Sequence, residues 1–276
     1  MQNCKKLKKI LINIFAWFVS LCALFPLIWM AYSSVKSNGD FLMDSLALPK
    51  EFVFINYPEA FEIGNLWLSM GNSLFYSVVN VTLVVTFAIL TAYFLARYDF
   101  KGKNIVRIIY TMGMLTPLYA LLVPIFVQYK MLGMLNNRLS LIISYYAMSI
   151  PLAIFLSESF IAGVPIAIDE ASVVDGCSLG QRLLRIIFPL CMPIIATVAI
   201  LTLLATWNEF AFAVILTPKL EMRTVSISLN YFTAGRELNY PFLMAALLSA
   251  SLPVITAYLF FSKLVIKGMT AGAVKG

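Results

Sequence analysis

The residues best suited to chemistry are concentrated in one stretch between two long apolar segments, DEASVVDGCSLGQRLLRIIFPL at 169–190. It contains three carboxylates, two glycines and two arginines, although only 12% of the whole chain is charged. The acids Asp169 and Glu170 predict the start of a short helix, because negative charge favours the N-terminal end of the helix dipole. Gly176 permits a tight turn, and the apolar pattern from about Leu179 predicts a second helix.

A helix, a glycine turn and a second helix form a compact unit that is suited to mechanical docking. The first helix, expected over 165–174, is short and amphipathic, so it can seat in a groove on a soluble partner and act as a lever. The alternative is a solvated connector. The chain has no histidine, which removes His-based triads, most zinc sites and His proton relays, so no catalytic residue and no metal ligand is predicted. No GxxxxGK[ST] loop, the phosphate-binding loop of many nucleotide sites, occurs in the chain.

Two more acids, Glu158 and Glu209, fall inside long apolar runs. Carboxylates in such runs are costly and usually face a bundle interior or a wet cavity. Trp207, Asn208 and Glu209 are therefore candidates for a translocation path, and the alternative is an interfacial polar cap with an aromatic-belt tryptophan. Glu158 lies near the inner end of its run, where we expect it to pair with a nearby arginine or to reach the interface.

The segments that must position these residues are long and apolar. Hydrophobic residues make up 61% of the 276-residue chain and the mean hydropathy is +0.90, whereas a soluble domain is about 45–50% apolar. Runs of about 20 apolar residues can cross a bilayer as helices, and prolines inside them are tolerated. The pattern predicts an all-α integral membrane protein, a single transmembrane domain over 1–276 with six spans at about 10–32, 74–96, 105–127, 139–161, 190–216 and 242–264.

The distribution of basic residues predicts the orientation. The first run resembles a secretory signal in its leading lysines, and Cys22 invites a lipoprotein interpretation, but the run is long and lacks a small-residue cleavage site, so we interpret it as an uncleaved span. With the N-terminus inside, thirteen Lys and Arg lie inside and seven outside, so both termini are predicted to be cytoplasmic.

Anionic inner-leaflet lipid accounts for the net charge of +7 without nucleic acid. The four cysteines then lie inside or within the bilayer, and no disulfide is expected.

Three loops stand out in this topology. The outside loop at 33–71 is long and polar, and loops of that length are often functional or disordered. A second outside loop at about 217–241 has a strand-like alternation over 224–229. The segment 162–189 is the only sizeable cytoplasmic loop, and it contains the helix–turn–helix unit.

This cytoplasmic segment resembles the EAA loop of bacterial ATP-binding-cassette import permeases. The family pattern is Glu-Ala-Ala, three residues, Gly, nine residues, Ile, any residue, Leu and Pro. The residues that match the pattern or occupy its positions are Glu170, Ala171, Ser172, Gly176, Ile186, Phe188 and Pro189. Ser172 replaces the second Ala and Phe188 replaces Leu, while Asp175 before Gly176 resembles the Asp-Gly pair of the carbohydrate branch.

The C-terminal sequence KGMTAGAVKG at 267–276 resembles the tail of the maltose and multiple-sugar permease subunit of that branch. The resemblance implies that the tail, with Gly272, Lys275 and Gly276, inserts between two ATPase subunits. The alternative is a frayed terminus. TWNEF at 206–210 also resembles the family's segment in the fifth span.

The resemblance implies a type I importer permease fold and a role as the membrane-spanning subunit that moves a sugar or oligosaccharide delivered by an extracellular binding protein. It further implies a second homologous permease in a heterodimer, two cytoplasmic ATPases that hold ATP and Mg, and no cofactor or enzymatic activity on this chain, which lies in the bacterial cytoplasmic membrane. The residues it assigns to ATPase coupling are Glu170, Ala171, Ser172, Asp175, Gly176, Ile186 and Pro189.

A stand-alone secondary transporter or channel is the other hypothesis. It would need paired ionisable groups within the bundle or a repeat of broken helices. The chain has no internal repeat, and only Glu158 and Glu209 lie inside spans, so this hypothesis is the weaker one. The sequence does not identify the sugar.

Overall fold

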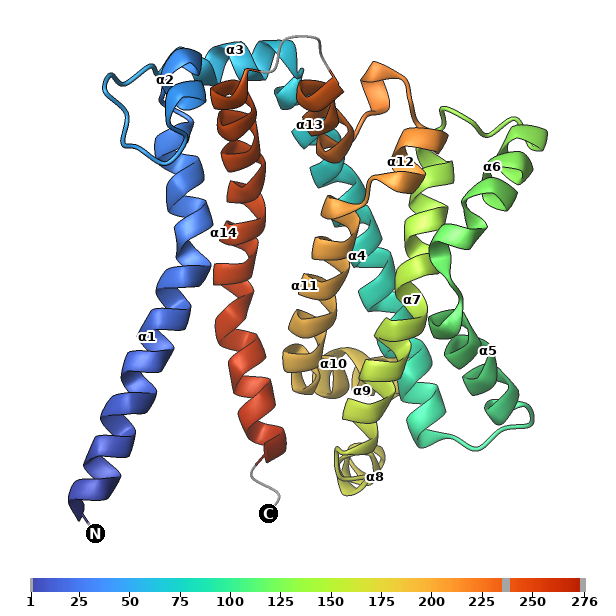
Figure 1. Ribbon diagram of the computed structural model, residues 1–276. Helices are drawn as coiled ribbons and strands as arrows, with labels where there is room; N and C mark the ends of the chain where they lie inside the picture. The colour runs from blue at the N-terminus through green and yellow to red at the C-terminus, as the bar shows by residue number, and fades with distance from the viewer. Residues whose placement is uncertain (1, 235–238, 274–276) are drawn as a thin grey trace. The chain divides into compact units, whose positions relative to one another are not determined.

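The computed structural model describes the backbone of residues 2–234 and 239–273 and the side chains of 9–233 and 239–262. Every regular element in these ranges is a helix, which confirms the predicted all-α class (Figure 1). The chain divides into two compact units, Met1–Trp67 with Ser228–Leu252 and Leu68–Ile227 with Pro253–Gly276. The single transmembrane domain stays a prediction.

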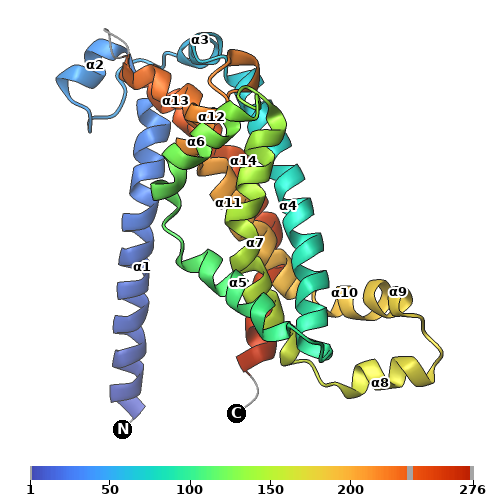
Figure 2. The ribbon, with the colours of Figure 1, turned by 90° about the vertical axis from the view of Figure 1, so that its right-hand side faces the viewer.

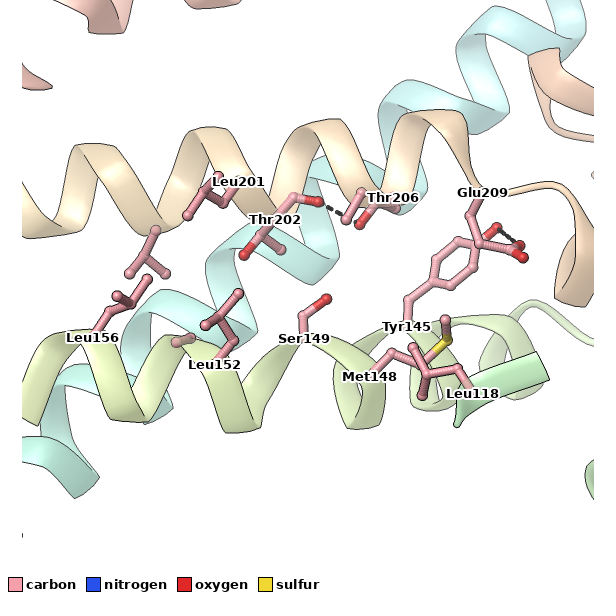
Figure 3. A pocket seen from close by; sticks show the side chains of 13 residues that line it. Leu118, Tyr145, Met148, Ser149, Leu152, Leu156, Leu201, Thr202, Thr206 and Glu209 are labelled. Carbon is pink, nitrogen blue, oxygen red and sulfur yellow. Dashed lines mark hydrogen bonds between the residues drawn. The ribbon is translucent and has the colours of Figure 1, made fainter. Parts of the chain in front are cut away.

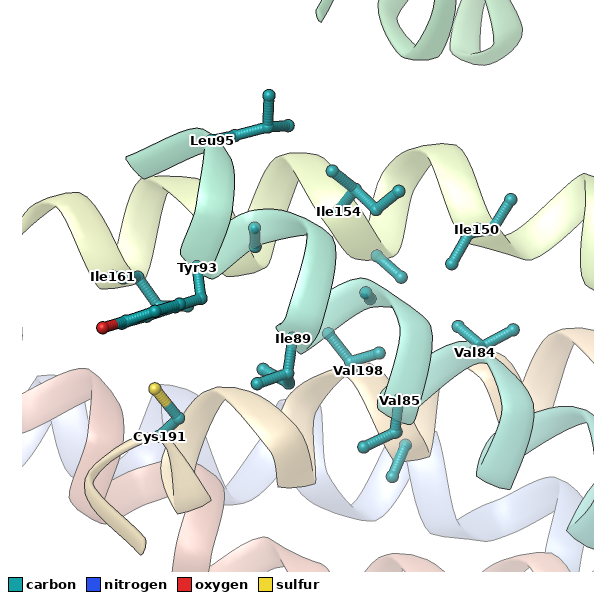
Figure 4. Packing of buried hydrophobic residues seen from close by; sticks show 14 of the residues in the cluster. Val84, Val85, Ile89, Tyr93, Leu95, Ile150, Ile154, Ile161, Cys191 and Val198 are labelled. Atoms are coloured by element: carbon teal, nitrogen blue, oxygen red, sulfur yellow. The ribbon is translucent and has the colours of Figure 1, made fainter. Parts of the chain in front are cut away.

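The core of the larger unit is built from three long helices, α4 (Leu66–Arg97), α7 (Arg138–Ala162) and α11 (Met192–Asn208). Buried residues on α4 recur in pairs four apart, which is the period of one helix face, and they pack against α7 and α11 (Figure 4). Ala88 and Ala92 are fully buried in this face, where small residues let helices approach closely.

Four helices are long and apolar enough to cross a membrane: Lys9–Ser33, Leu66–Arg97, Arg138–Ala162 and Tyr240–Ser262. Two further candidates are bent pairs, so the described residues hold four spans, or six if each pair is one span. Six spans and cytoplasmic termini therefore stay predictions.

The bends correct the expectation of continuous helices at 105–127 and 190–216. The first lies between α5 (Lys103–Leu115) and the 3-10 helix η1 (Leu118–Leu121) with α6 (Leu122–Met131), and the angle is 90°. Thr116 is extended there, as expected before Pro117. In the second case the bend of 75° lies at Cys191, between helical residues 179–190 and α11. The predicted span is interrupted again where α11 ends at Asn208, Glu209 is extended, and the short α12 (Ala211–Leu216) follows.

The strand predicted over 224–229 is wrong, because α13 (Val225–Ala234) is a helix preceded by the 3-10 helix η3 (Leu220–Met222). The buried residues Val225, Ser228 and Phe232 are spaced three and four apart, which is a helical spacing. A six-residue alternation was too short to distinguish the two periods.

The smaller unit contains α1 (Gln2–Ser33), α2 (Asn38–Met43), α3 (Asn56–Ile63) and the first part of α14 (Tyr240–Ala273). The loop at 33–71, which is predicted to lie outside, is folded rather than disordered. Its buried Lys36 donates to the carbonyls of Asp44 and Ser45, and the Asn56 amide donates to the carbonyls of Ser34 and Lys36, so these buried polar groups are satisfied.

Candidate functional site

The candidate coupling segment follows α7 and contains four short helices. They are α8 (Ala167–Val174), α9 (Leu179–Arg182), the π-helix η2 (Leu183–Ile187) and α10 (Phe188–Leu190). Gly176 turns the chain between α8 and α9 at a φ of +74°, and Ser178 begins α9 in a capping box with Gln181. The predicted helix, glycine turn and second helix are therefore confirmed, and Figure 2 shows the segment projecting to one side of the lower ends of α4 and α7.

The residues predicted for coupling lie on two sides of this segment. Glu170, Ala171, Asp175 and Gly176 are exposed, and Val174 beside them is 86% exposed. The exposed side of α8 therefore combines two carboxylates with apolar surface.

The remaining predicted coupling residues are placed differently. Ser172 is buried, and its hydroxyl donates to the Asp169 carbonyl over 2.6 Å. Its side chain therefore lies on the buried side of α8. Ile186 is partly buried in η2, and Pro189 in α10 is exposed.

A buried ion pair fixes the base of α8 to α4. The side chain of Asp169 is 9% exposed and that of Arg97 is 7% exposed, and Arg97 Nε lies 2.8 Å from Asp169 Oδ2. The Tyr93 hydroxyl donates to Asp169 Oδ1 over 2.7 Å, and Arg97 Nη2 donates to the Val164 carbonyl over 2.9 Å. A buried carboxylate is tolerated only when it is paired in this way.

Further charged residues lie near this ion pair between α4 and the coupling segment. Arg182 of α9 lies near enough to Tyr93 and Asp169 to interact with them electrostatically, and Ile187 of η2 is buried in the same cluster as Tyr93. A second carboxylate at this end of α4 is different: Asp99 is exposed, and a hydrogen bond from Lys103 holds the pKa of its carboxyl below the ordinary value. No pattern in the sequence pointed to the role of Asp169, because Tyr93 and Asp169 are 76 residues apart.

A cavity of about 140 Å³ lies between α7 and α11. Figure 3 shows polar side chains from both helices along it, with apolar residues such as Leu118 and Leu152 beside them. The polar lining residues are Tyr145, Ser149, Thr202, Thr206 and Glu209. Sequence reasoning missed the first four, although the hydroxyls repeat at a spacing of four residues on each helix, which places them on one face.

Glu209 lies where α11 ends. Its carboxylate accepts hydrogen bonds from the backbone N–H groups of Phe212 and Ala213 over 2.8 and 3.0 Å, and from the Tyr145 hydroxyl over 3.0 Å. The carboxylate thus caps the first turn of α12, where negative charge is favourable.

The two residues predicted beside Glu209 do not line this cavity. Trp207 is buried, and its carbonyl accepts from the Ser226 hydroxyl. Asn208 is exposed, and its amide donates to the Leu204 carbonyl.

For Glu158, the structure confirms the first of the two expected alternatives, pairing with a nearby arginine. It pairs with Arg107 of α5, whose Nε donates to Glu158 Oε1 over 2.7 Å.

In the predicted tail, Gly272 falls in the last turn of α14, while Lys275 and Gly276 lie outside the described residues. Among the described residues, no group of three His, Cys, Asp or Glu side chains is placed to hold a metal ion.

Comparison with known proteins gives a consistent set of matches. Residues 84–271 match the family model described as binding-protein-dependent transport system inner membrane component. The chain is 31% identical to the arabinooligosaccharides transport system permease protein AraQ of Bacillus subtilis, over 97% of this chain and 96% of that protein. It is 29% identical to the sulfoquinovosyl glycerol transport system permease protein SmoH of Agrobacterium fabrum, over 92% and 89%.

Among solved structures, the fold is similar to a chain of a bacterial ABC transporter involved in the import of the acidic polysaccharide alginate. The TM-score is 0.82 at 23% identity, over 94% of this chain and 96% of that chain. An inward-facing form of the MetNI methionine ABC transporter gives a TM-score of 0.55 at 14% identity, over 74% and 94%.

Proposed function

Because the chain belongs to the family of binding-protein-dependent transport system inner membrane components, we propose that it is the permease subunit of an ATP-driven sugar importer. It is a multi-pass protein of the bacterial plasma membrane with the fold of an ABC importer permease. Its relatives are named for arabinooligosaccharides and sulfoquinovosyl glycerol. The cargo proposed here is accordingly a sugar or oligosaccharide that an extracellular binding protein delivers.

The chain is proposed to work with three kinds of partner. Two cytoplasmic ATPase subunits hold ATP and Mg and perform the hydrolysis, so this chain is not itself an enzyme and binds no cofactor. A second, homologous permease completes a heterodimer. Residues 9–28 of α1 are mostly apolar and all exposed in this chain, and a helix that is hydrophobic all round is suited to lipid or to another subunit.

The observation that carries the proposal is the exposed α8 on its fixed base. Glu170, Asp175 and Gly176 present a carboxylate pair and a tight turn to a partner, while Asp169 ties the same helix to α4. A lever needs both a free contact surface and a rigid attachment. The C-terminal tail, with Gly272, Lys275 and Gly276, is proposed as a second contact between the ATPase subunits.

The translocation path is proposed to run along the polar side of the cavity between α7 and α11. Glu209 lies there with a ring of hydroxyl groups, and intramembrane carboxylates usually face a wet cavity. Trp207 and Asn208 border the same break in the helix without lining the cavity, so their proposed place is beside the path, next to Glu209.

Co-purification tests the proposal directly. The tagged chain should bring an ATPase and a second permease with it, and the purified assembly should hydrolyse ATP faster when the sugar-loaded binding protein is added. Variants with Glu170→Lys or Asp175→Lys should lose the ATPase during purification. Lys130→Glu should retain it, because Lys130 lies in the last turn of α6 and is predicted to be on the opposite side of the membrane. An assembly that contains no ATPase would overturn the proposal.

A further inference from the structure

We infer that α4 carries the movement of α8 to the segment 217–225 at the opposite end of the same helix, with Asp169 and Asn72 as the positioning residues at its two ends. The inference rests on the proposed function, because the movement of α8 would come from the ATPases. All residues involved lie in the larger unit.

At the α8 end, α4 is attached by charge as well as by packing. Arg97 Nε is 2.8 Å from Asp169, and Tyr93 donates to the same carboxylate. Arg97 also holds the Val164 carbonyl, just before α8. These contacts are buried, so moving α8 without α4 would leave a buried carboxylate and a buried guanidinium unpaired, which is strongly unfavourable.

At the opposite end, α4 holds the backbone of the segment that follows α12. The Asn72 amide donates to the carbonyls of Glu221 and Arg223 over 2.9 and 3.1 Å. The Asn72 side-chain oxygen accepts from Arg138 over 3.1 Å, so both halves of this buried amide are occupied.

Two neighbours of Asn72 strengthen this attachment. The Ser73 hydroxyl accepts from the Val225 backbone N–H over 2.8 Å, and the Tyr76 hydroxyl donates to the Met222 carbonyl over 3.3 Å. Three consecutive carbonyls, those of residues 221–223, are therefore held by two side chains of α4. The segment 217–225 must follow this end of α4 or lose several hydrogen bonds at once.

The helix between these ends is built to move as one body. From Asn72 to Arg97 it has neither proline nor glycine, and at about 1.5 Å per residue it separates the two attachments by about 38 Å. Two of its neighbours are interrupted, since the α5–α6 pair bends by 90° and the pair formed by residues 179–190 and α11 bends by 75°. The third neighbour, α7, is continuous but contains Pro151. Between these ends, nearer to Asn72, Asn80 attaches α4 to α11 through a hydrogen bond of 2.8 Å to Thr206.

A thiol reporter at the far end of α4 tests the inference in the assembled importer. The parent protein carries Leu220→Cys, which is 43% exposed in η3, and its four native cysteines are replaced by serine. The complex with its ATPases and binding protein is placed in lipid nanodiscs, and the maleimide labelling rate is measured without nucleotide and after vanadate trapping of ATP. Trapped nucleotide is quantified in the same samples.

We expect trapping to change the labelling rate of the parent at least about fivefold, the lower end of usual coupling between sites. Asp169→Asn at one end and Asn72→Leu at the other should each reduce the change to less than twofold, with nucleotide trapping intact. Combining them should cause no further loss, since either one disconnects the helix. Asp99→Asn, an exposed acid at the same end, and Thr82→Val, an exposed hydroxyl on α4, should keep the parent change.

Two results would overturn the inference while leaving the proposed function intact. One is sugar-stimulated ATP hydrolysis in a parent whose labelling rate is insensitive to trapping. The other is a full change in the Asp169→Asn and Asn72→Leu variants. If Asp169→Asn fails to assemble, Tyr93→Phe removes only the hydroxyl that donates to Asp169 and must weaken the change. A parent that shows no sugar-stimulated hydrolysis at all would instead overturn the proposed function.

Discussion

At the scale of single residues, Asp169 and Asp99 are two carboxylates near the same end of α4 with opposite environments. Asp169 is buried against Arg97, while Asp99 pairs with Lys103 at the surface. Breaking a buried pair leaves an uncompensated charge, whereas an exposed pair contributes little. The same substitution at the two acids therefore measures how much burial adds to the contribution of an ion pair to stability.

Asp169→Ala should lower the free energy of unfolding by about 3–5 kcal/mol, because Arg97 remains buried without its partner. Thermal unfolding in detergent measures the loss, and Asp99→Ala should leave the midpoint unchanged. Adding Arg97→Met to Asp169→Ala should recover most of the loss, since neither charge is then buried. Equal shifts for Asp169→Ala and Asp99→Ala would contradict the importance of the buried pair.

Glu209→Gln should reduce sugar uptake by about tenfold or more. The substitution removes the charge that would strengthen a hydrogen bond from the sugar to this side chain, and a hydrogen bond to a charged group is worth about 1.5–3 kcal/mol. The glutamine keeps an oxygen that can accept from Phe212, so the cap of α12 is largely retained. Uptake of radiolabelled sugar at fixed protein level measures the effect. Glu158→Gln is the control, because that acid pairs with Arg107 away from the cavity, and its uptake should be unchanged. Normal uptake in Glu209→Gln would assign this carboxylate to the cap alone.

At the scale of elements, the glycines and prolines show what the sequence could and could not predict. Gly176 followed an acidic helix start and preceded an apolar run, so the turn between α8 and α9 could be predicted from local chemistry. Pro117 and Pro151 looked alike in sequence, yet one lies at a 90° bend and the other inside the continuous α7. The difference depends on tertiary neighbours, since neighbouring helices decide whether a membrane helix tolerates its proline.

Gly176→Val should uncouple transport while leaving membrane insertion intact. Nothing lies within 4 Å of a Cβ at this position, so the cost comes from the positive φ of +74°, which a β-branched residue strongly resists. Sugar-stimulated ATP hydrolysis should fall about 5- to 150-fold, the usual range of coupling between sites. Gly180→Val is the matched control, because Gly180 also has open space and no positive φ. Equal losses in both variants would remove the turn from the coupling mechanism.

Gly113→Ala and Gly71→Ala should shift stability in opposite directions. A Cβ at Gly113 of α5 would lie 2.9 Å from the Pro151 ring on α7, whereas Gly71 of α4 has nothing within 4 Å. Alanine gains about 0.5–1 kcal/mol over glycine in a helix interior, so Gly71→Ala should raise the thermal midpoint. Gly113→Ala should lower it, because the proline ring cannot move aside without separating the helices. A rise in both variants would show that α5 and α7 are not tightly packed.

At the scale of the whole molecule, apolar run length was sufficient to predict the helical membrane class and four helices that are long and apolar enough to cross a bilayer. It could not predict which helices join through polar contacts. The Asn72 attachment links residues about 150 positions apart, and the Asp169 attachment pairs two charges with no shared motif. Such contacts depend on how the helices pack, and nothing in the local pattern encodes them.

The source of energy distinguishes the importer from a stand-alone transporter at this same scale. A secondary transporter couples to an ion gradient and needs paired ionisable groups in its bundle, but Glu158 is committed to Arg107 and Glu209 to the first turn of α12. In proteoliposomes that contain the assembled complex and enclosed ATP, sugar uptake should therefore require both ATP and the binding protein. Collapsing the proton and sodium gradients with ionophores should leave the initial rate unchanged, and replacing ATP with a non-hydrolysable analogue should abolish it. Uptake that persists without ATP and disappears with the ionophores would show that α8 transmits no work from an ATPase.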